Sequence, residues 1–311
     1  NGCATSTIRL LGSQCKISGL TISIDYEARF AANASWQKVN PTGGAGDGPT
    51  GFEINTGDDN LISHCNVIGG KTTFLATDTI LQGSDCFIIV NGDRNVMSDC
   101  YCEDATFEAF RSEGTDNRFV RCKAINHRGN GFRGTGFGRL WLEQCHFESV
   151  RCSGRTALLI DPGSGAHTGT MTRAAIIAAQ RFEQVWITGC YIHAGPTSTP
   201  VLMTGASGLK IASVLDCHVS DCEIIGTRDL NNDALRVEDG VENVTFTDCR
   251  INNGCLFTAS GSAGTSVYTG PITAHADNGS GKVRFTVTGT HGLVAGKSLF
   301  IHGSSISLYN Q

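Results

Sequence analysis

The feature that most constrains this chain is a short motif that ends in cysteine and returns after little more than twenty residues. The clearest copies are NVMSDC at residues 95–100 and NRFVRC at residues 117–122, whose cysteines are 22 residues apart. Seven copies align on their cysteines, which are Cys65, Cys100, Cys122, Cys145, Cys190, Cys222 and Cys249. A motif that recurs this often indicates a protein built from repeated structural units.

The spacing of the motif predicts the type of unit. Successive cysteines are 35, 22, 23, 45, 32 and 27 residues apart, so the shortest complete unit has about 22 residues and the step of 45 has room for two. A second short apolar segment follows the cysteine, as in CKISGLTISI and CEIIGT. Three short strands in such a unit are typical of a parallel β-helix, whose coils pair about 4.8 Å apart. Leucine-rich repeats have a similar period, but their several leucines per unit are missing.

We therefore predict an all-β fold, a right-handed single-stranded parallel β-helix over residues 1–262, followed by the start of a small β module over residues 263–311. The register breaks near residues 30–50 and 161–173, where glycine-rich stretches indicate loop insertions. Both ends of the sequence resemble cuts in a longer polypeptide, and we expect the chain to be a fragment.

In a β-helix the recurring residues occupy equivalent positions on successive coils. We interpret the cysteines as an inward-facing ladder of free thiols that act as small hydrophobic residues. Asparagine begins four of the copies, and we expect these side chains to bond from coil to coil. The cysteines off the ladder that could form disulfides are Cys3, Cys86, Cys152 and Cys255.

Composition excludes several classes of protein. A net charge of −5 argues against a nucleic-acid-binding protein built on a basic face. No uninterrupted apolar stretch approaches the roughly 18 residues of a spanning helix, and no signal peptide is visible, so we expect no membrane anchor. The cysteines show no zinc-type spacing, and we predict neither a metal site nor a cofactor.

The best candidate for chemistry is the stretch from Glu103 to Arg133. The 22-residue offset places Glu108 over Asn130 and Arg111 over Arg133, where two stacked arginines need an anion between them. Glycoside hydrolysis needs two carboxyl groups about 5 Å or roughly 6.5–9.5 Å apart, which neighbouring coils can supply. The candidate catalytic residues are Glu108, Glu113 and Asp104, and the candidate substrate-binding residues are Arg111, Arg133, His127, Asn130 and Trp36. The alternative is a solvated ladder of ion pairs.

Aromatic and histidine side chains offer weaker signals. Trp141 and Trp186 occupy the same place in RLWLEQC and QVWITGC, and we assign both to the core. Tyr101 and Tyr191 are candidates for an exposed platform for a sugar ring. His146, His193 and His218 are expected to point outward beside their strands.

The segment THGLVAGKSLFIHGSSISLYN, which follows the predicted helix, resembles a pattern found in bacteriophage tail spike and tail fibre proteins. The resemblance implies a homotrimer in the phage tail of a virion, assembled in the cytoplasm of a host bacterium. Its implied partners are other virion tail proteins and a bacterial surface polysaccharide, either capsule or lipopolysaccharide. Free thiols agree with folding in a reducing cytoplasm.

Three functions remain open at this point. The first is a tail spike that binds the polysaccharide and cleaves it as a depolymerase, either a glycoside hydrolase or a lyase. The second is a purely adhesive or structural tail protein. The third is a secreted polysaccharide lyase or hydrolase, although the YGFDPHD-type motif of alginate epimerases and the clustered aspartates of pectate lyases are absent.

Overall fold

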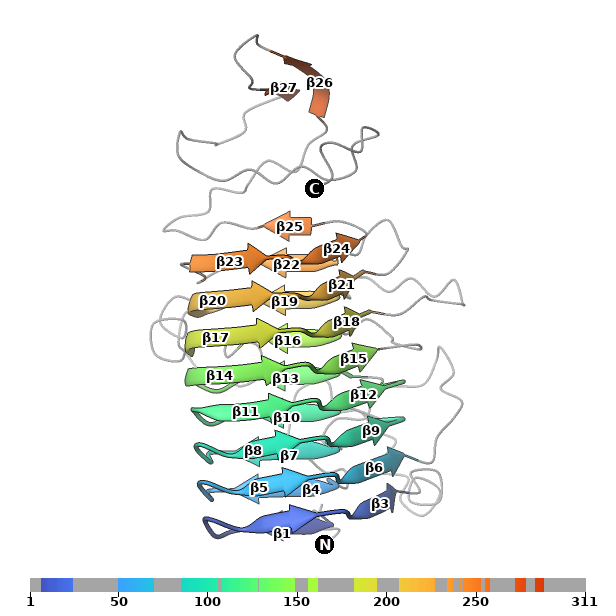
Figure 1. Ribbon diagram of the computed structural model, residues 1–311, viewed down its shortest axis with the longest axis vertical. Helices are drawn as coiled ribbons and strands as arrows, with labels where there is room; N and C mark the ends of the chain where they lie inside the picture. Colours follow the sequence, from blue (N-terminus) through green and yellow to red (C-terminus); the bar gives the residue numbers. More distant parts are fainter. Residues whose placement is uncertain are drawn as a thin grey trace, which may run out of the picture.

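The computed structural model describes residues 7–24, 50–69, 85–105, 108–127, 129–148, 156–161, 182–194, 207–226, 234–237, 241, 243–252, 255–257, 272–277 and 283–287. Within these residues there is no helix, and the strands wind into a right-handed parallel β-helix (Figure 1). Each complete coil gives one strand to each of three parallel sheets, which we call A, B and C in chain order. The predicted fold class is confirmed.

The strands stack in sequence order within each sheet. Sheet A contains β1 (Ile8–Leu10), β4 (Phe52–Asn55), β7 (Phe87–Val90), β10 (Phe110–Ser112), β13 (Phe132–Gly134), β16 (Leu158–Ile160), β19 (Leu209–Ile211), β22 (Leu235–Val237) and β25 (Cys255–Phe257). Sheet B contains β2 (Lys16–Ser18), β5 (Leu61–Ser63), β8 (Val96–Ser98), β11 (Asn117–Val120), β14 (Gly138–Glu143), β17 (Phe182–Thr188), β20 (Val214–Ser220) and β23 (Asn243–Thr247). Sheet C contains β3 (Thr21–Ile24), β6 (Asn66–Gly69), β9 (Tyr101–Glu103), β12 (Lys123–Ile125), β15 (His146–Glu148), β18 (Tyr191–His193), β21 (Glu223–Ile225) and β24 (Arg250–Asn252). A separate antiparallel pair is formed by β26 (Ile272–Asp277) and β27 (Val283–Val287).

The register decides how many coils lie between Cys145 and Cys190, where the spacing left room for two. Strand β14 pairs directly with β17, and β15 pairs directly with β18. The 45 residues between Cys145 and Cys190 therefore form one enlarged coil and not two.

The core lies between the three sheets and follows from the period-two alternation of the strands. On sheet A, the first inward position is phenylalanine in four successive coils, at Phe52, Phe87, Phe110 and Phe132. The rings of Phe52 and Phe87 are stacked with centroids 5.1 Å apart, and those of Phe87 and Phe110 with centroids 4.9 Å apart. Equivalent side chains can stack in this way because neighbouring parallel strands are about 4.8 Å apart.

The seven cysteines of the aligned motif line the corner between sheets B and C. The residue before each cysteine of the aligned motif has a φ between 51° and 64°, and the left-handed conformation turns the chain within one residue. From Cys100 onward, each thiol of the motif reaches back to the preceding coil: Cys122 Sγ lies 3.4 Å from the Met97 carbonyl oxygen, and Cys145 Sγ lies 3.4 Å from that of Phe119. The thiols thus act both as core side chains and as weak donors to carbonyl groups at the corner.

The asparagines form a shorter internal ladder. Asn95 Oδ1 accepts from the backbone N–H of Asn60 at 2.9 Å, and Asn117 Oδ1 accepts from that of Asn95 at 2.9 Å. Asn243 does not extend this ladder. It is exposed and pairs with Asp216, and the position of the ladder in its coil is taken by the next residue, Val244. In the preceding coil, the same position of the ladder is taken by Cys217, which is buried.

Candidate functional site

The predicted cluster on sheet A brings Glu108, Asn130 and Arg133 together, but it does not expose them. The Glu108 carboxylate accepts from the backbone N–H and from Nδ2 of Asn130, both at 3.0 Å. Arg133 Nη1 lies 3.3 Å from Glu108 Oε1. Glu108 has no exposed surface and Arg133 is 7% exposed, so this carboxylate joins two coils within a buried site.

The second arginine of the pair has carboxylates of its own. Arg111 stacks over Arg133, as the 22-residue offset predicts, and it forms ion pairs with Glu113 and with Asp85, the latter at 3.5 Å. Asp85 is only 3% exposed, and its Oδ1 atom has no hydrogen-bond partner. Burial raises the pKa of Asp85 to about 7, against the opposing effect of the nearby Arg111. The anions that separate the stacked arginines are therefore side chains of this protein.

The other predicted residues have partners that differ from those of Glu108, Arg111 and Arg133. Asp104 is buried at the end of β9 and accepts a hydrogen bond from Asn126 Nδ2. His127 is fully buried, and its Nδ1 donates to the Gly129 carbonyl oxygen at 2.9 Å. Burial lowers the pKa of His127 to about 4, so its imidazole is neutral at pH 7. Trp36 lies outside the described residues, and the catalytic and binding roles assigned from the sequence stay predictions.

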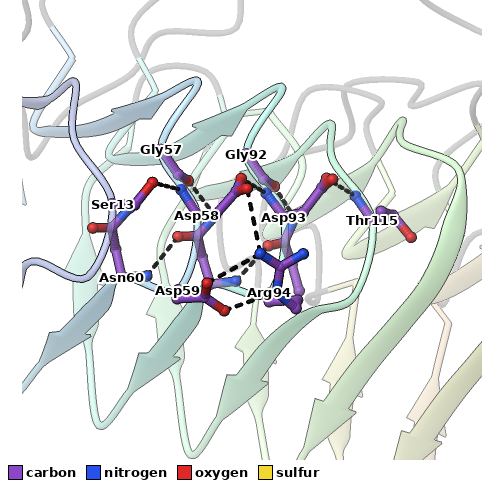
Figure 2. Close-up of polar contacts among 11 residues, drawn as sticks. Ser13, Gly57, Asp58, Asp59, Asn60, Gly92, Asp93, Arg94 and Thr115 are labelled. Atoms are coloured by element: carbon purple, nitrogen blue, oxygen red, sulfur yellow. Dashed lines mark hydrogen bonds and ion pairs between the residues drawn. The ribbon is translucent and has the colours of Figure 1, made fainter.

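A polar ladder at the corner between sheets A and B was missed by the sequence analysis (Figure 2). Asp58 Oδ1 accepts from the Asp93 N–H at 3.0 Å, and Asp93 Oδ1 accepts from the Thr115 N–H at 2.9 Å. Arg94 forms a two-pronged pair with Asp59, with contacts of 2.8 and 3.0 Å. The quartets GDDN, GDRN and GTDN at residues 57–60, 92–95 and 114–117 are the signal that could have revealed it.

The outer face of sheet B carries a row of aromatic side chains, which corrects the assignment of both tryptophans to the core. Trp141 and Trp186 are partly exposed, whereas their neighbours Leu140, Leu142 and Ile187 are buried. Period-two alternation therefore points both indoles toward solvent. The same column holds Arg118 in the preceding coil and His218 in the following one.

The indoles of this row are stacked with their faces nearly parallel. Their centroids are 5.0 Å apart and their planes differ by 3°. This separation is close to the spacing of about 4.8 Å between neighbouring parallel strands, so the stack follows from the strand pairing. The guanidinium of Arg139 lies 5.5 Å from the Trp141 centroid, and the His218 ring lies 6.2 Å from that of Trp186. We call Arg118, Trp141, Trp186 and His218 the aromatic row.

Polar side chains flank the aromatic row on both sides. One flanking column contains Arg139, Gln184, Asp216 and Asn243, and the other contains Glu143, Thr188, Ser220 and Thr247. Arg118 Nη2 is paired with Glu143 Oε2 at 2.7 Å, and Arg139 Nε is paired with Asp116 Oδ1 at 2.6 Å. A rigid sheet thus presents aromatic surface between rows of hydrogen-bonding groups.

Sheet C also carries outward aromatic and histidine side chains. Tyr101 and Tyr191 are partly exposed, as are His146 and His193. His146 Nε2 lies 2.9 Å from Glu148 Oε2, and the His146 and Tyr191 rings are 4.6 Å apart. Tyr101 donates to Glu103 at 2.9 Å. These polar groups therefore already have partners on their own face of the molecule.

Comparison with protein-family models, with curated protein sequences and with solved structures finds no match to this chain. In the part of the chain that the structure describes, no helix is long and apolar enough to span a membrane. Over the same residues, no three His, Cys, Asp or Glu side chains are grouped to hold a metal ion.

Proposed function

We propose that this chain is part of a spike-type adhesion protein, of the kind found in phage tails, which binds a bacterial surface polysaccharide along sheet B. Capsule and lipopolysaccharide are the two polymers that the resemblance implies. The parallel β-helix supports the proposal because it repeats equivalent positions at a fixed spacing, which suits a ligand that is itself a repeating polymer.

The observation that carries the proposal is the stacked pair Trp141 and Trp186 on an outer sheet face. Large indoles are costly to leave in water, and a sugar ring buries part of an aromatic face while its hydroxyl groups bond nearby polar side chains. Gln184, Thr188 and Ser220 lie on either side of the row and offer such partners. The same residues serve an adhesive protein with or without cleavage.

We propose binding and not cleavage, because the strongest catalytic candidates do not face solvent. Glu108 and Asp104 are buried, and each is bonded to a side chain of the next coil. Glu113 is partly exposed, but it is paired with Arg111. A depolymerase role for these three carboxylates remains a prediction, which the release of reducing ends from the same polysaccharides would test.

The experiment is a binding assay with immobilised capsule and lipopolysaccharide preparations. We expect Trp141→Ala/Trp186→Ala to lose at least about tenfold in affinity, since removing buried aromatic anchors commonly costs more than 1.4 kcal/mol. Tyr101→Ala is the matched control, because it removes an outward aromatic side chain from sheet C. Binding that survives the double substitution, or that is lost equally in the control, would contradict the assignment to sheet B.

A further inference from the structure

The charges around the aromatic row point to the chemical class of its ligand. Two guanidinium groups, those of Arg118 and Arg139, lie in the row or beside it. Four carboxylates lie beside the row or near these guanidinium groups, and they belong to Asp116, Glu143, Glu183 and Asp216. The formal balance of these groups is two minus four, or −2. This local excess of negative charge has the same sign as the whole chain, whose net charge is −5.

Both guanidinium groups are already paired with carboxylates of this chain. Arg118 is held by Glu143 at 2.7 Å, and Arg139 is held by Asp116 through two contacts of 2.6 and 3.0 Å. Two parallel N–H···O contacts are the geometry in which arginine binds a carboxylate most strongly. A glycan carboxylate would have to displace one of these partners and then lie near the remaining acidic groups.

The uncharged groups beside the row can instead bond hydroxyl and amide groups. Gln184 and Thr188 supply neutral donors and acceptors on either side of Trp186, and Ser220 Oγ lies 3.3 Å from Thr188 Oγ1. Equivalent positions recur in every coil, about 4.8 Å apart along the axis. The row runs across the strands, so a bound chain would lie along the axis of the β-helix.

From these observations we propose that sheet B binds an uncharged glycan, built from neutral hexoses or N-acetylhexosamines, and excludes polyanionic ones. This inference rests on the proposed function, because it assigns the ligand class of the same surface. The aromatic row supplies the attraction, and the acidic groups around it supply the discrimination against carboxylated and sulfated chains.

The test compares neutral polymers (dextran, galactomannan and hydroxyethylcellulose) with acidic ones (polygalacturonate, alginate and hyaluronan) at low ionic strength. Affinity electrophoresis gives binding, and tryptophan fluorescence reports contact, because the chain has only 3 tryptophans and two are in the row. We expect at least one neutral polymer to retard the protein and shift its fluorescence. Trp186→Ala should weaken this binding about tenfold.

A charge variant separates discrimination from binding itself. Glu143→Gln/Asp216→Asn removes two carboxylates and frees Arg118, so it should raise the affinity for acidic polymers relative to the affinity for the neutral polymer. Tyr101→Ala should change neither.

The possible outcomes distinguish the two proposals. Tryptophan-dependent binding that is tighter for acidic than for neutral polymers would overturn the inference but leave the proposed function standing. Absence of binding to any polymer, together with a loss of thermal stability in Trp186→Ala, would make the row a cross-strand stabilising stack and overturn both proposals.

Discussion

The corner between sheets A and B requires glycine in four successive coils, because these coils approach too closely for a side chain. A Cβ atom at Gly92 would lie 2.5 Å from the Gly57 carbonyl oxygen, and one at Gly136 would lie 2.3 Å from that of Gly114. At Gly114 the distance to the Gly92 oxygen would be 1.9 Å. The neighbouring atoms are backbone, so only a movement of whole coils could relieve such contacts.

Gly114→Ala is therefore expected to lower the free energy of unfolding by at least about 2 kcal/mol, as overpacking of a rigid site does. Gly12→Ala is the matched control in the same column, because its Cβ would meet nothing nearer than Cys15 Sγ at 3.8 Å. That variant should be neutral or gain up to about 1 kcal/mol from a stiffer unfolded chain. Urea unfolding of both proteins measures the difference, and equal effects would contradict this explanation.

Asp85 provides a pH dependence that can be isolated by substitution. Its folded-state pKa of about 7 is above the value of about 3.9 in an unfolded chain, so the native state binds the proton more tightly. The cost of ionising this buried group is absent below about pH 4, grows as the pH rises, and is complete above about pH 7.

Asp85→Asn should therefore become more stable relative to the original protein as the pH is raised from about 4 to 8, by on the order of a few kcal/mol. The unfolding free energies of both proteins across this range give the difference. Asp59→Asn is the control, because the Arg94 guanidinium lowers the pKa of that exposed carboxyl. Its difference should run in the opposite direction and change only below about pH 5. A pH-independent difference for Asp85→Asn would show that this carboxyl does not titrate abnormally.

At the scale of the element, burial between the strands makes the thiols of the interior unreactive. Burial raises the pKa of Cys102, Cys122 and Cys217, and of other cysteines that line the interior. Only the thiolate is an effective nucleophile, so a buried and protonated thiol combines two barriers to modification.

We expect the folded protein to react slowly with a disulfide reagent at pH 8, with Cys15 and Cys249 reacting first because they are partly exposed. In denaturant the chain should release at least the 11 thiols that the structure describes as free, and all 14 if Cys3, Cys152 and Cys255 are reduced. A count below 11 would reveal disulfides and contradict the described thiols. Rapid labelling of the folded state would show that the corners open readily.

At the scale of the whole molecule, the proposed spike function implies an assembly of three chains. Light scattering should then give a mass three times the 32.9 kDa of one chain. The outer faces of a β-helix resemble one another in sequence, so only this measurement distinguishes a trimer from the free-standing enzyme that the sequence left open. A monomer would contradict the spike proposal, and a monomer that releases reducing ends would favour the secreted enzyme.

Much of this architecture could be read from the repeat. The 22-residue offset correctly placed Arg111 over Arg133 and Glu108 over Asn130, because no residue is inserted between these strands. The offset could not give the pairing between Cys145 and Cys190, because the extra residues there belong to a single enlarged coil. It also could not show that the Glu108 carboxylate is buried, since the offset gives the pairing of residues and not the side chains that cover them.

The sequence by itself determined the period, the three strands of each coil and the position of the cysteines, because these follow from local alternation and turn chemistry. Only the tertiary structure decided which way Trp141 and Trp186 point. Both lie in runs of three apolar residues, so composition cannot tell the inward from the outward positions, and a shift of one residue exchanges the two faces. The pairing of β14 with β11 and β17 settles it, because Leu140 and Leu142 fill the interior and leave the indoles outside.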